Sequence, residues 1–293
     1  MGTILFCVGF NCVMNPYVFL FNRDIPAYGI AYVTAVFAGI IFALHRRKKY
    51  GANTEDTLFM GLYAVIGGLI GAKCLYVITI TNSVIKYRDI IKSDLWNNLY
   101  NLLIPGGFVF FWGLIGGILA ALYYLRKYRL EIPVYADIFA PCIPLAHAIG
   151  RMGCFFAGCC YGIESSHGIE FNLSLSAPHG VRLFPVQLME AGINVLIMIT
   201  LLVYERNQKG KGQLLLIYLF LYSAARFVLE FWRGDLERGF IFGLSTSQII
   251  ASVLFFISIC LIIYYNHTSN SRKCHRATDT DVYGEQSYGS TTK

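Results

Sequence analysis

Charged residues are scarce in this sequence: they make up only 14% of its 293 residues, whereas 56% are hydrophobic. A soluble domain of this length rarely carries so little charge. The apolar residues fall in long blocks, which predicts a membrane protein with several spanning helices. The sequence also lacks a basic stripe, so we expect no nucleic acid partner. The net charge of +7 instead fits an excess of Lys and Arg at one face of a lipid bilayer.

The pattern of a signal peptide is missing from the beginning of the sequence. Residues 3–21 are apolar, but polar residues and a proline interrupt them and no basic residue precedes them. A signal peptide needs a charged first region and a clear cleavage site. We therefore expect residues 1–27 to form an interfacial or re-entrant segment, with either Met1 or Met14 as the true start.

Seven apolar blocks predict an all-α, polytopic membrane protein, with one membrane domain over 28–265 and a disordered tail over 266–293. Clustered basic residues at 45–49, 126–129 and 206–211 fall on one side if the seven spans alternate. That side is expected to be cytoplasmic, together with the C-terminus, while the N-terminus lies outside. The expected spans cover about 28–44, 57–80, 107–125, 134–150, 184–204, 214–232 and 244–265.

The stretch PCIPLAHAIGRMGCFFAGCCYG, at 141–162, combines a membrane helix pattern with ionisable side chains and thiols. His147 and Arg151 are four residues apart and therefore share one face of a helix. An arginine at the middle of a span costs about 2.5–3.5 kcal/mol, so it usually faces the interior of a bundle or a watery cavity. We predict that this stretch forms one wall of an active site. For His147, a packing role with a satisfied hydrogen bond is the alternative.

A second polar stripe is predicted on the sixth span, in RFVLEFWRGD. Arg226, Glu230 and Arg233 are spaced at i, i+4 and i+7, and Asp235 follows them. Paired guanidiniums suit a phosphodiester, because the fork of an arginine matches phosphate oxygens. A purely structural pair of Arg226 and Glu230 is the alternative.

Three further polar residues lie near the ends of spans. Glu190 and Gln187 are close to the start of the span at 184–204, where Glu190 could be a general base or a hydrogen-bonding residue between helices. Tyr28 begins the first span, where it is either an interfacial anchor or a headgroup contact.

The cysteines Cys154, Cys159 and Cys160 leave several interpretations open. They are buried and inert, or Cys154 forms a disulfide with one of the pair, or they bind a metal or act as nucleophiles. The spacing in CFFAGCC does not supply the CxxC pairs that are typical of zinc sites. We therefore expect no metal and no cofactor.

Small residues form two runs inside the spans, GGLIGA at 67–72 and GLIGG at 113–117. Such residues allow membrane helices to pack closely. A smooth groove for a lipid tail is the alternative, and the sequence alone does not decide between the two.

Several of these motifs together resemble one known family. DIPAYGIAY, ADIFAPCIPLAHAIGRMGCFFAGCCYG and YSAARFVLEFWRGD occur in the order found in the bacterial prolipoprotein diacylglyceryl transferase family, with similarity over residues 14–265. The resemblance implies a seven-span, multi-pass enzyme of the bacterial inner (cytoplasmic) membrane. Such an enzyme moves a diacylglyceryl group from phosphatidylglycerol to the lipobox cysteine of a prolipoprotein signal peptide, and glycerol phosphate leaves as a thioether forms.

The resemblance also implies roles for individual residues. Arg151 matches the signature arginine of the family, and Arg226 and Glu230 match its paired charges. Tyr28 matches a functional tyrosine, and Gly162 matches a signature glycine. Substrate contacts are thus expected from Tyr28, Gly162, Gln187, Glu190, Arg233 and Asp235.

Two positions depart from the family pattern. Phe111 stands where many members carry histidine or tyrosine, and Cys154 stands where many carry asparagine. Because Phe111 has no proton acceptor, we predict His147 as the base and Glu190 as the second choice. Arg151 and Arg226 are expected to hold the phosphodiester. A paralogue with another acceptor, or a lipid-binding or transport protein, is the alternative function.

Overall fold

The computed structural model describes residues 16–20, 23–86, 110–174, 176–208, 210–234, 240–241, 243–265 and 267. The chain forms two compact units, Met1–Gly39 with Phe139–Lys293 and Ile40–Ile138. Helix α1, Ala27–Tyr50, begins in the first unit and ends in the second. The predicted tail from residue 268 onward and Asp235 both lie outside the described residues.

The described part of the chain is mostly helical, which confirms the prediction of a multi-pass, largely α-helical membrane protein. Helix α5, Phe110–Lys127, occupies the place of the predicted third span but is not one of the candidate spans. The count of seven and the sidedness of the termini therefore stay predictions. Within the part of the chain that the structure describes, six helical segments are long and apolar enough to cross a membrane: Ala27–Tyr50, Thr54–Cys74, Ile132–Ala157, Val186–Asn207, Gln213–Trp232 and Thr246–Tyr265.

Among the described residues, three small antiparallel sheets, each of two strands, add to the helices. The polytopic helical architecture is as predicted, and these short strands were not expected because they lie in connections whose sequences show no clear alternation of apolar and polar residues. They are β1 (Tyr17–Leu20) with β2 (Arg23–Pro26), β3 (Glu164–Glu170) with β4 (Arg182–Leu183), and β5 (Phe240–Ile241) with β6 (Leu244–Ser245).

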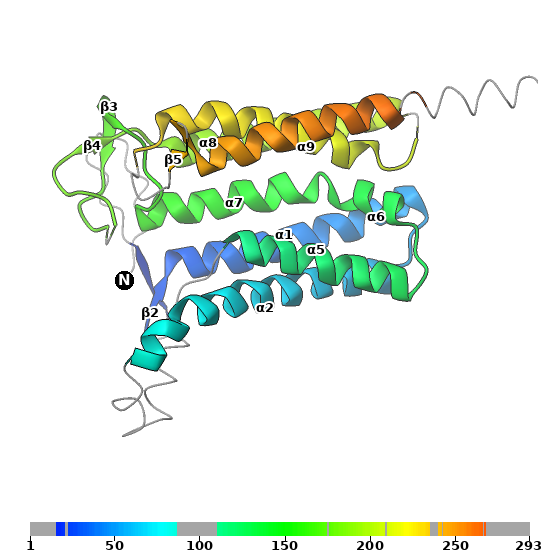
Figure 1. Cartoon of the computed structure of the whole chain (residues 1–293), viewed down its shortest axis with the longest axis horizontal. Helices are drawn as coiled ribbons and strands as arrows, with labels where there is room; N and C mark the ends of the chain where they lie inside the picture. The colour runs from blue at the N-terminus through cyan, green and yellow to red at the C-terminus, as the bar shows by residue number, and fades with distance from the viewer. Residues whose placement is uncertain are drawn as a thin grey trace, which may run out of the picture. The chain divides into compact units, whose positions relative to one another are not determined.

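In the second unit, α2 (Thr54–Lys86) and α5 lie side by side through their glycines (Figure 1). A Cβ on Gly67 would lie 2.6 Å from the carbonyl oxygen of Gly116, and a Cβ on Gly116 would lie 3.0 Å from the Cα of Gly71. The small-residue runs therefore serve helix packing. These two faces fill each other, so they do not form a groove for a lipid tail.

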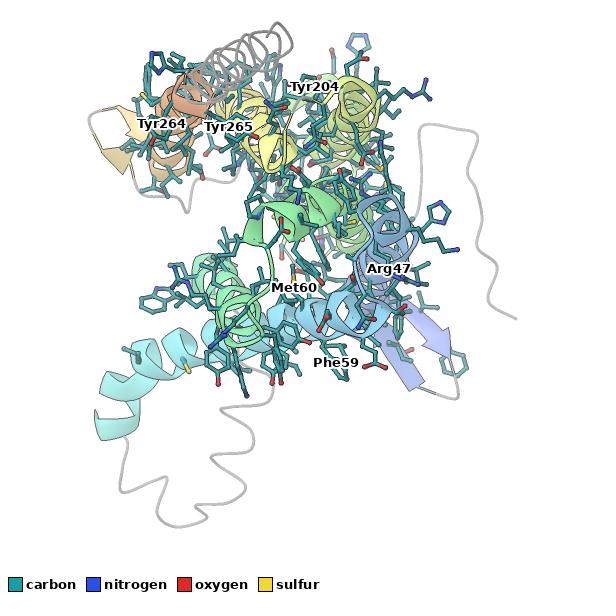
Figure 2. The ribbon with its side chains drawn as sticks, turned by 90° about the vertical axis from the view of Figure 1, so that its right-hand side faces the viewer. Arg47, Phe59, Met60, Tyr204, Tyr264 and Tyr265 are labelled. Atoms are coloured by element: carbon teal, nitrogen blue, oxygen red, sulfur yellow. The ribbon has the colours of Figure 1, made fainter. Side chains whose placement is uncertain are left out.

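The basic end of α1 is fixed within the same unit. Arg46 donates from Nε to the carbonyl oxygen of Ile138 at 2.9 Å and from Nη2 to that of Asp137 at 2.9 Å. These carbonyls belong to α6, Ile132–Phe139, so the guanidinium satisfies groups at the end of that helix. Arg47 reaches the loop before α2 by donating to the carbonyl oxygen of Ala52 at 3.2 Å (Figure 2).

The first unit holds α7 (Cys142–Ala157), α8 (Val186–Tyr204), α9 (Gln213–Leu229) and the helix Thr246–Tyr265. Helix α8 packs against both α7 and α9. An apolar core between α8, α9 and the segment just before α7 is formed by Ala140, Ile197, Leu201, Leu214 and Tyr218. This core fixes how α8 packs against its neighbours, and so it also fixes the position of the polar side chains on α8.

The loop between α8 and α9 is joined to the end of the last helix. The hydroxyl of Tyr265 donates to the carbonyl oxygen of Lys211 at 3.0 Å. Figure 2 labels Tyr265 and also Tyr204, which ends α8. The basic segment 206–211 therefore follows the C-terminal end of α8 and lies away from the first turns of that helix.

Helix α7 ends at Gly158, whose φ of 67° is in the left-handed region that favours glycine. The N–H of Gly158 donates to the carbonyl oxygen of Phe155, and the N–H of Cys159 donates to the carbonyl oxygen of Cys154 at 3.1 Å. Below this turn, Phe155 packs against Phe171 within a small apolar cluster. The chain therefore leaves α7 in a defined direction, and this places the thiols that follow.

Candidate active site

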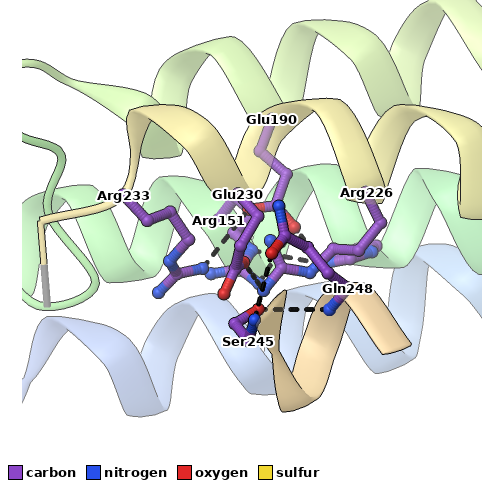
Figure 3. Close-up of polar contacts among 8 residues, drawn as sticks. Arg151, Glu190, Arg226, Glu230, Arg233, Ser245 and Gln248 are labelled. Atoms are coloured by element: carbon purple, nitrogen blue, oxygen red, sulfur yellow. Dashed lines mark hydrogen bonds and ion pairs between the residues drawn. The ribbon is translucent and has the colours of Figure 1, made fainter. Parts of the chain in front are cut away.

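Glu190 is the centre of a buried charge network (Figure 3). Its carboxylate projects from the second turn of α8 and is only 1% exposed. Arg151 Nη2 lies 3.0 Å from Glu190 Oε1, and Arg233 Nη1 lies 3.9 Å from Oε2. Two cations from different parts of the chain therefore share one carboxylate.

These contacts are ion pairs more than directed hydrogen bonds. Neither Glu190 oxygen accepts a hydrogen bond of good geometry from a described residue, although both oxygens are buried. A buried carboxylate is costly unless cations and donors compensate it. The carboxylate therefore keeps acceptor capacity inside a cationic environment, an arrangement that is unusual in a purely structural pair.

Arg226 and Glu230 form a second, shorter pair. Arg226 Nη2 lies 2.7 Å from Glu230 Oε2, across the junction of α9 and the short helix η2, Glu230–Trp232. Both side chains are largely buried. The Nη1 of Arg226 is also buried and donates to no described residue. Nη2 of this guanidinium is thus held by Glu230, while Nη1 can still donate a hydrogen bond.

His147 contacts Arg151, the partner that the helix spacing suggested, and also Glu190 of α8. Arg151 Nε donates to His147 Nε2 at 3.2 Å, and the same Nε2 lies 3.4 Å from Glu190 Oε1. The ring also packs against Tyr222 on α9, with centroids 5.4 Å apart. Acceptance from Arg151 requires a neutral imidazole, whereas a protonated imidazole would pair with Glu190. His147 therefore has a partner in either protonation state.

Gln187 does not join this network. It lies one turn before Glu190 on α8, and its Nε2 donates to the carbonyl oxygen of Cys159 at 2.8 Å. The amide thus anchors the turn that follows α7. In the structure Gln187 Nε2 holds this backbone carbonyl, and the substrate contact that the sequence suggested for Gln187 stays a prediction.

The thiols of Cys154, Cys159 and Cys160 gather beyond this turn. All three are free, and their sulfur atoms lie within 4.8 Å of one another. Hydrogen bonds with the thiols of Cys154 and Cys159, together with the nearby charges of Arg233 and Arg151, lower the pKa of Cys160. The thiol cluster therefore lies within the electrostatic reach of Arg151 and Arg233.

Gly162 and Tyr28 lie at the edges of the site. A Cβ on Gly162 would lie 2.5 Å from the carbonyl oxygen of Phe184 and 2.7 Å from that of Trp232, so no side chain fits there. Gly162 pairs with Arg233 in an isolated bridge, which joins the thiol loop to the end of α9. Tyr28, at the start of α1, is 49% exposed and its backbone packs on Gly153 of α7.

The family model described as prolipoprotein diacylglyceryl transferase matches residues 16–264. The chain belongs to the prolipoprotein diacylglyceryl transferase family. A phosphatidylglycerol–prolipoprotein diacylglyceryl transferase of Clostridium tetani is 34% identical over 254 residues, covering 86% of this chain and 97% of the relative. A second protein of that name from Clostridium perfringens is 36% identical over 250 residues, covering 84% and 92%.

In this member of the diacylglyceryl transferase family, most of the predicted site residues converge. His147, Arg151, Glu190 and Arg233 make one network, and Arg226 with Glu230 lies beside it. Gly162 and Gln187 fix the surrounding backbone. Asp235 and the side chain of Phe111 lie outside the described part, so their predicted roles stay predictions.

Ser245 and Gln248 also stand beside the charges in the family member's site (Figure 3), although the sequence motif that contains them, LSTSQII, suggested no role for either residue. The N–H of Ser245 donates to Gln248 Oε1 at 3.0 Å, and the N–H of Gln248 donates to Ser245 Oγ at 3.1 Å. This reciprocal pair is a capping box at the start of the last helix. The spacing S-x-x-Q before an apolar run was the signal that could have revealed it.

Proposed function

We propose that this chain transfers the diacylglyceryl group of phosphatidylglycerol to the cysteine thiol of a prolipoprotein signal peptide. A thioether forms, and glycerol phosphate leaves. The observation that carries the proposal is the buried Nη1 of Arg226, which donates to no described residue and lies beside the ion pair of Arg151 with Glu190 (Figure 3). A phosphodiester headgroup carries one negative charge and would accept a hydrogen bond from that nitrogen.

The lipid headgroup is held by Arg151 and Arg226 in this proposal. The buried Nη1 of Arg226 remains available as a donor, while Nη2 is oriented by Glu230 Oε2 at 2.7 Å. Arginine binds phosphate oxygens in forked geometry, and such donors act strongly in a medium of low dielectric. The same donors would stabilise the charge that develops on the departing glycerol phosphate, which is the electrostatic part of catalysis.

The acceptor thiol must lose its proton, because the thiolate is the working nucleophile. We assign the proton to His147. Its Nε2 accepts from Arg151 when neutral and lies 3.4 Å from Glu190 when it becomes a cation. Glu190 would then stabilise the imidazolium, which is what a general base requires of its neighbours. Glu190 itself is less suited to be the base, since Arg151 and Arg233 already compensate its charge.

We place the protein in the cytoplasmic membrane of a bacterium, with the site toward the outer face. The support is the basic segments at 45–49, 126–129 and 206–211, which orient as cytoplasmic. In the first unit, the last of these segments lies at the end of α8 away from Glu190. The lipid donor and the signal peptide would both approach from the bilayer.

Complementation of a bacterial strain depleted of its own transferase tests the proposal. The full chain should restore growth, and mass spectrometry should find a diacylglyceryl thioether on the N-terminal cysteine of a lipoprotein. Arg151→Ala and Arg226→Ala should fail in both readouts while remaining in the membrane at normal levels. Lipidation by either variant at the normal level would contradict the proposed function of the site.

A further inference from the structure

The thiol cluster of Cys154, Cys159 and Cys160 is not used by the function proposed so far. Its three sulfur atoms lie within 4.8 Å of one another, and none is in a disulfide. Cys154 comes from the last turn of α7, and the other two follow the glycine that ends this helix. The turn after α7 brings Cys159 and Cys160 back toward Cys154, and the linear spacing CFFAGCC did not suggest this approach.

The dimensions of the cluster suit a thiophilic metal ion. Zinc is bound by thiolates at about 2.3 Å, so three sulfur ligands of a tetrahedral site are about 3.8 Å apart. Small side-chain rotations would bring sulfur atoms from within 4.8 Å to that separation. Thiolate ligands select zinc and monovalent copper over the harder divalent ions.

The backbone around the cluster is held in an uncommon conformation. Cys160 has a φ of 58°, in the left-handed region that residues other than glycine rarely adopt. The carbonyl of the preceding Cys159 is fixed by Gln187 at 2.8 Å. A strained non-glycine residue that is held in place by its neighbours is typical of functional sites. Here the conformation turns the two adjacent thiols toward Cys154.

The charges near the cluster complement a metal–thiolate group. Three thiolates and one divalent ion together carry one negative charge. Arg151 and Arg233 lie close enough to Cys160 to interact electrostatically with its sulfur. Guanidiniums would therefore balance the excess charge without competing for the metal, because an arginine has no lone pair to donate.

We propose that Cys154, Cys159 and Cys160 bind one Zn²⁺ ion, and that its fourth coordination position receives the thiol of the acceptor cysteine. Catalytic zinc sites have three protein ligands and leave the fourth position for water or substrate. Cys159 and Cys160 are only partly buried, so the cluster is not sealed within the protein. This inference rests on the proposed function and adds to it the group that activates the thiol.

The step balances in atoms and charge. On coordination, the acceptor S–H bond breaks and its proton passes by way of water to His147. The resulting thiolate attacks the glyceryl carbon next to the phosphate, so a C–S bond forms as the C–O bond breaks. The electron pair of that C–O bond stays on the phosphate oxygen, and glycerol phosphate leaves. A metal-bound thiol is deprotonated at neutral pH, which is the benefit of the metal for this reaction.

Metal binding is tested with the full chain purified in detergent micelles under reducing conditions. After incubation with Zn²⁺ and removal of the excess, elemental analysis should find about one ion per chain. Cys154→Ser, Cys159→Ser and Cys160→Ser should each lower retention at least tenfold, whereas the exposed control Cys260→Ser should not. Retention by the triple serine variant, or a disulfide within the cluster after mild handling, would overturn the site.

The acceptor position is tested with Cd²⁺ in place of Zn²⁺. A signal peptide with its lipobox cysteine should increase the sulfur-to-cadmium charge-transfer absorption, and the same peptide with serine should not. Equal spectra with both peptides, or full transferase activity after chelation of the metal, would overturn the role in thiol activation. The proposed function would survive that result, because lipidation by the protein is measured separately.

Discussion

Arg151 of α7 and Glu190 of α8 meet at 3.0 Å between a guanidinium nitrogen and a carboxylate oxygen that is almost wholly buried. The pair links α7, which carries Cys154, to α8, which carries Gln187. Because the same carboxylate also faces His147 and Arg233, it fixes the positions of three basic groups. We regard Glu190 as the residue on which the geometry of the site depends most.

Substitution of Glu190 tests this dependence. Glu190→Gln keeps the size of the side chain but leaves two buried guanidiniums without their anion. Breaking a buried pair in this way costs about 3–5 kcal/mol. The unfolding midpoint in detergent should therefore fall, and diacylglyceryl transfer should be lost. The matched control is Glu164→Gln, an exposed residue of β3. Equal unfolding midpoints for the two variants would contradict the central role of Glu190.

Arg226→Lys separates geometry from charge at the headgroup site. Lysine keeps the positive charge but cannot form the forked contact of a guanidinium. We expect the transfer rate to fall by about 10²–10³-fold, as for removal of one preorganised donor, with little change in stability. Arg182→Lys is the control, because Arg182 is exposed and pairs with Glu170 only at 3.5 Å. A normal rate for Arg226→Lys would show that the fork holds no phosphate.

His147→Gln tests the proton acceptor. In the parent protein the rate should fall toward acidic pH, because a protonated imidazole cannot accept the thiol proton. The variant should be slower at neutral pH and should lose this acidic limb. Both predictions are checked by measuring the rate of transfer to a lipobox peptide between pH 5 and 8. An unchanged pH profile would exclude His147 as the base and leave it a positioning residue for Arg151.

Helix periodicity predicted the contacts between site residues of the same helix, but not the contacts between residues of different helices. The spacings of His147 with Arg151 and of Arg226 with Glu230 place each pair on one helical face, and the structure has both contacts. The approach of Glu190 depends on how α8 packs against α7, which no local pattern encodes. The gathering of the thiols depends on left-handed residues after α7, where sequence preference is weak.

Gly162 provides a test of the packing around the site. Gly162→Ala would place a Cβ within 2.5 Å of Phe184 and 2.7 Å of Trp232, both at backbone carbonyl oxygens that cannot move without displacing their elements. We expect a clearly lower unfolding midpoint and poor accumulation in membranes. Gly192→Ala is the control, since a Cβ there meets nothing within 4 Å. In a helix that control should be neutral or stabilising, by about 1 kcal/mol at most. Similar stability of both variants would contradict the close approach at Gly162.

The most direct measurement for the whole account is the transfer reaction with purified components. The protein in micelles is mixed with phosphatidylglycerol and a signal peptide that carries a lipobox cysteine, and the product is followed by mass spectrometry. The account predicts a diacylglyceryl thioether and an equal amount of glycerol phosphate from the parent protein, and neither product from Arg151→Ala. A parent protein that is folded but forms no thioether, or an Arg151→Ala variant that forms it at the parent rate, would contradict the account.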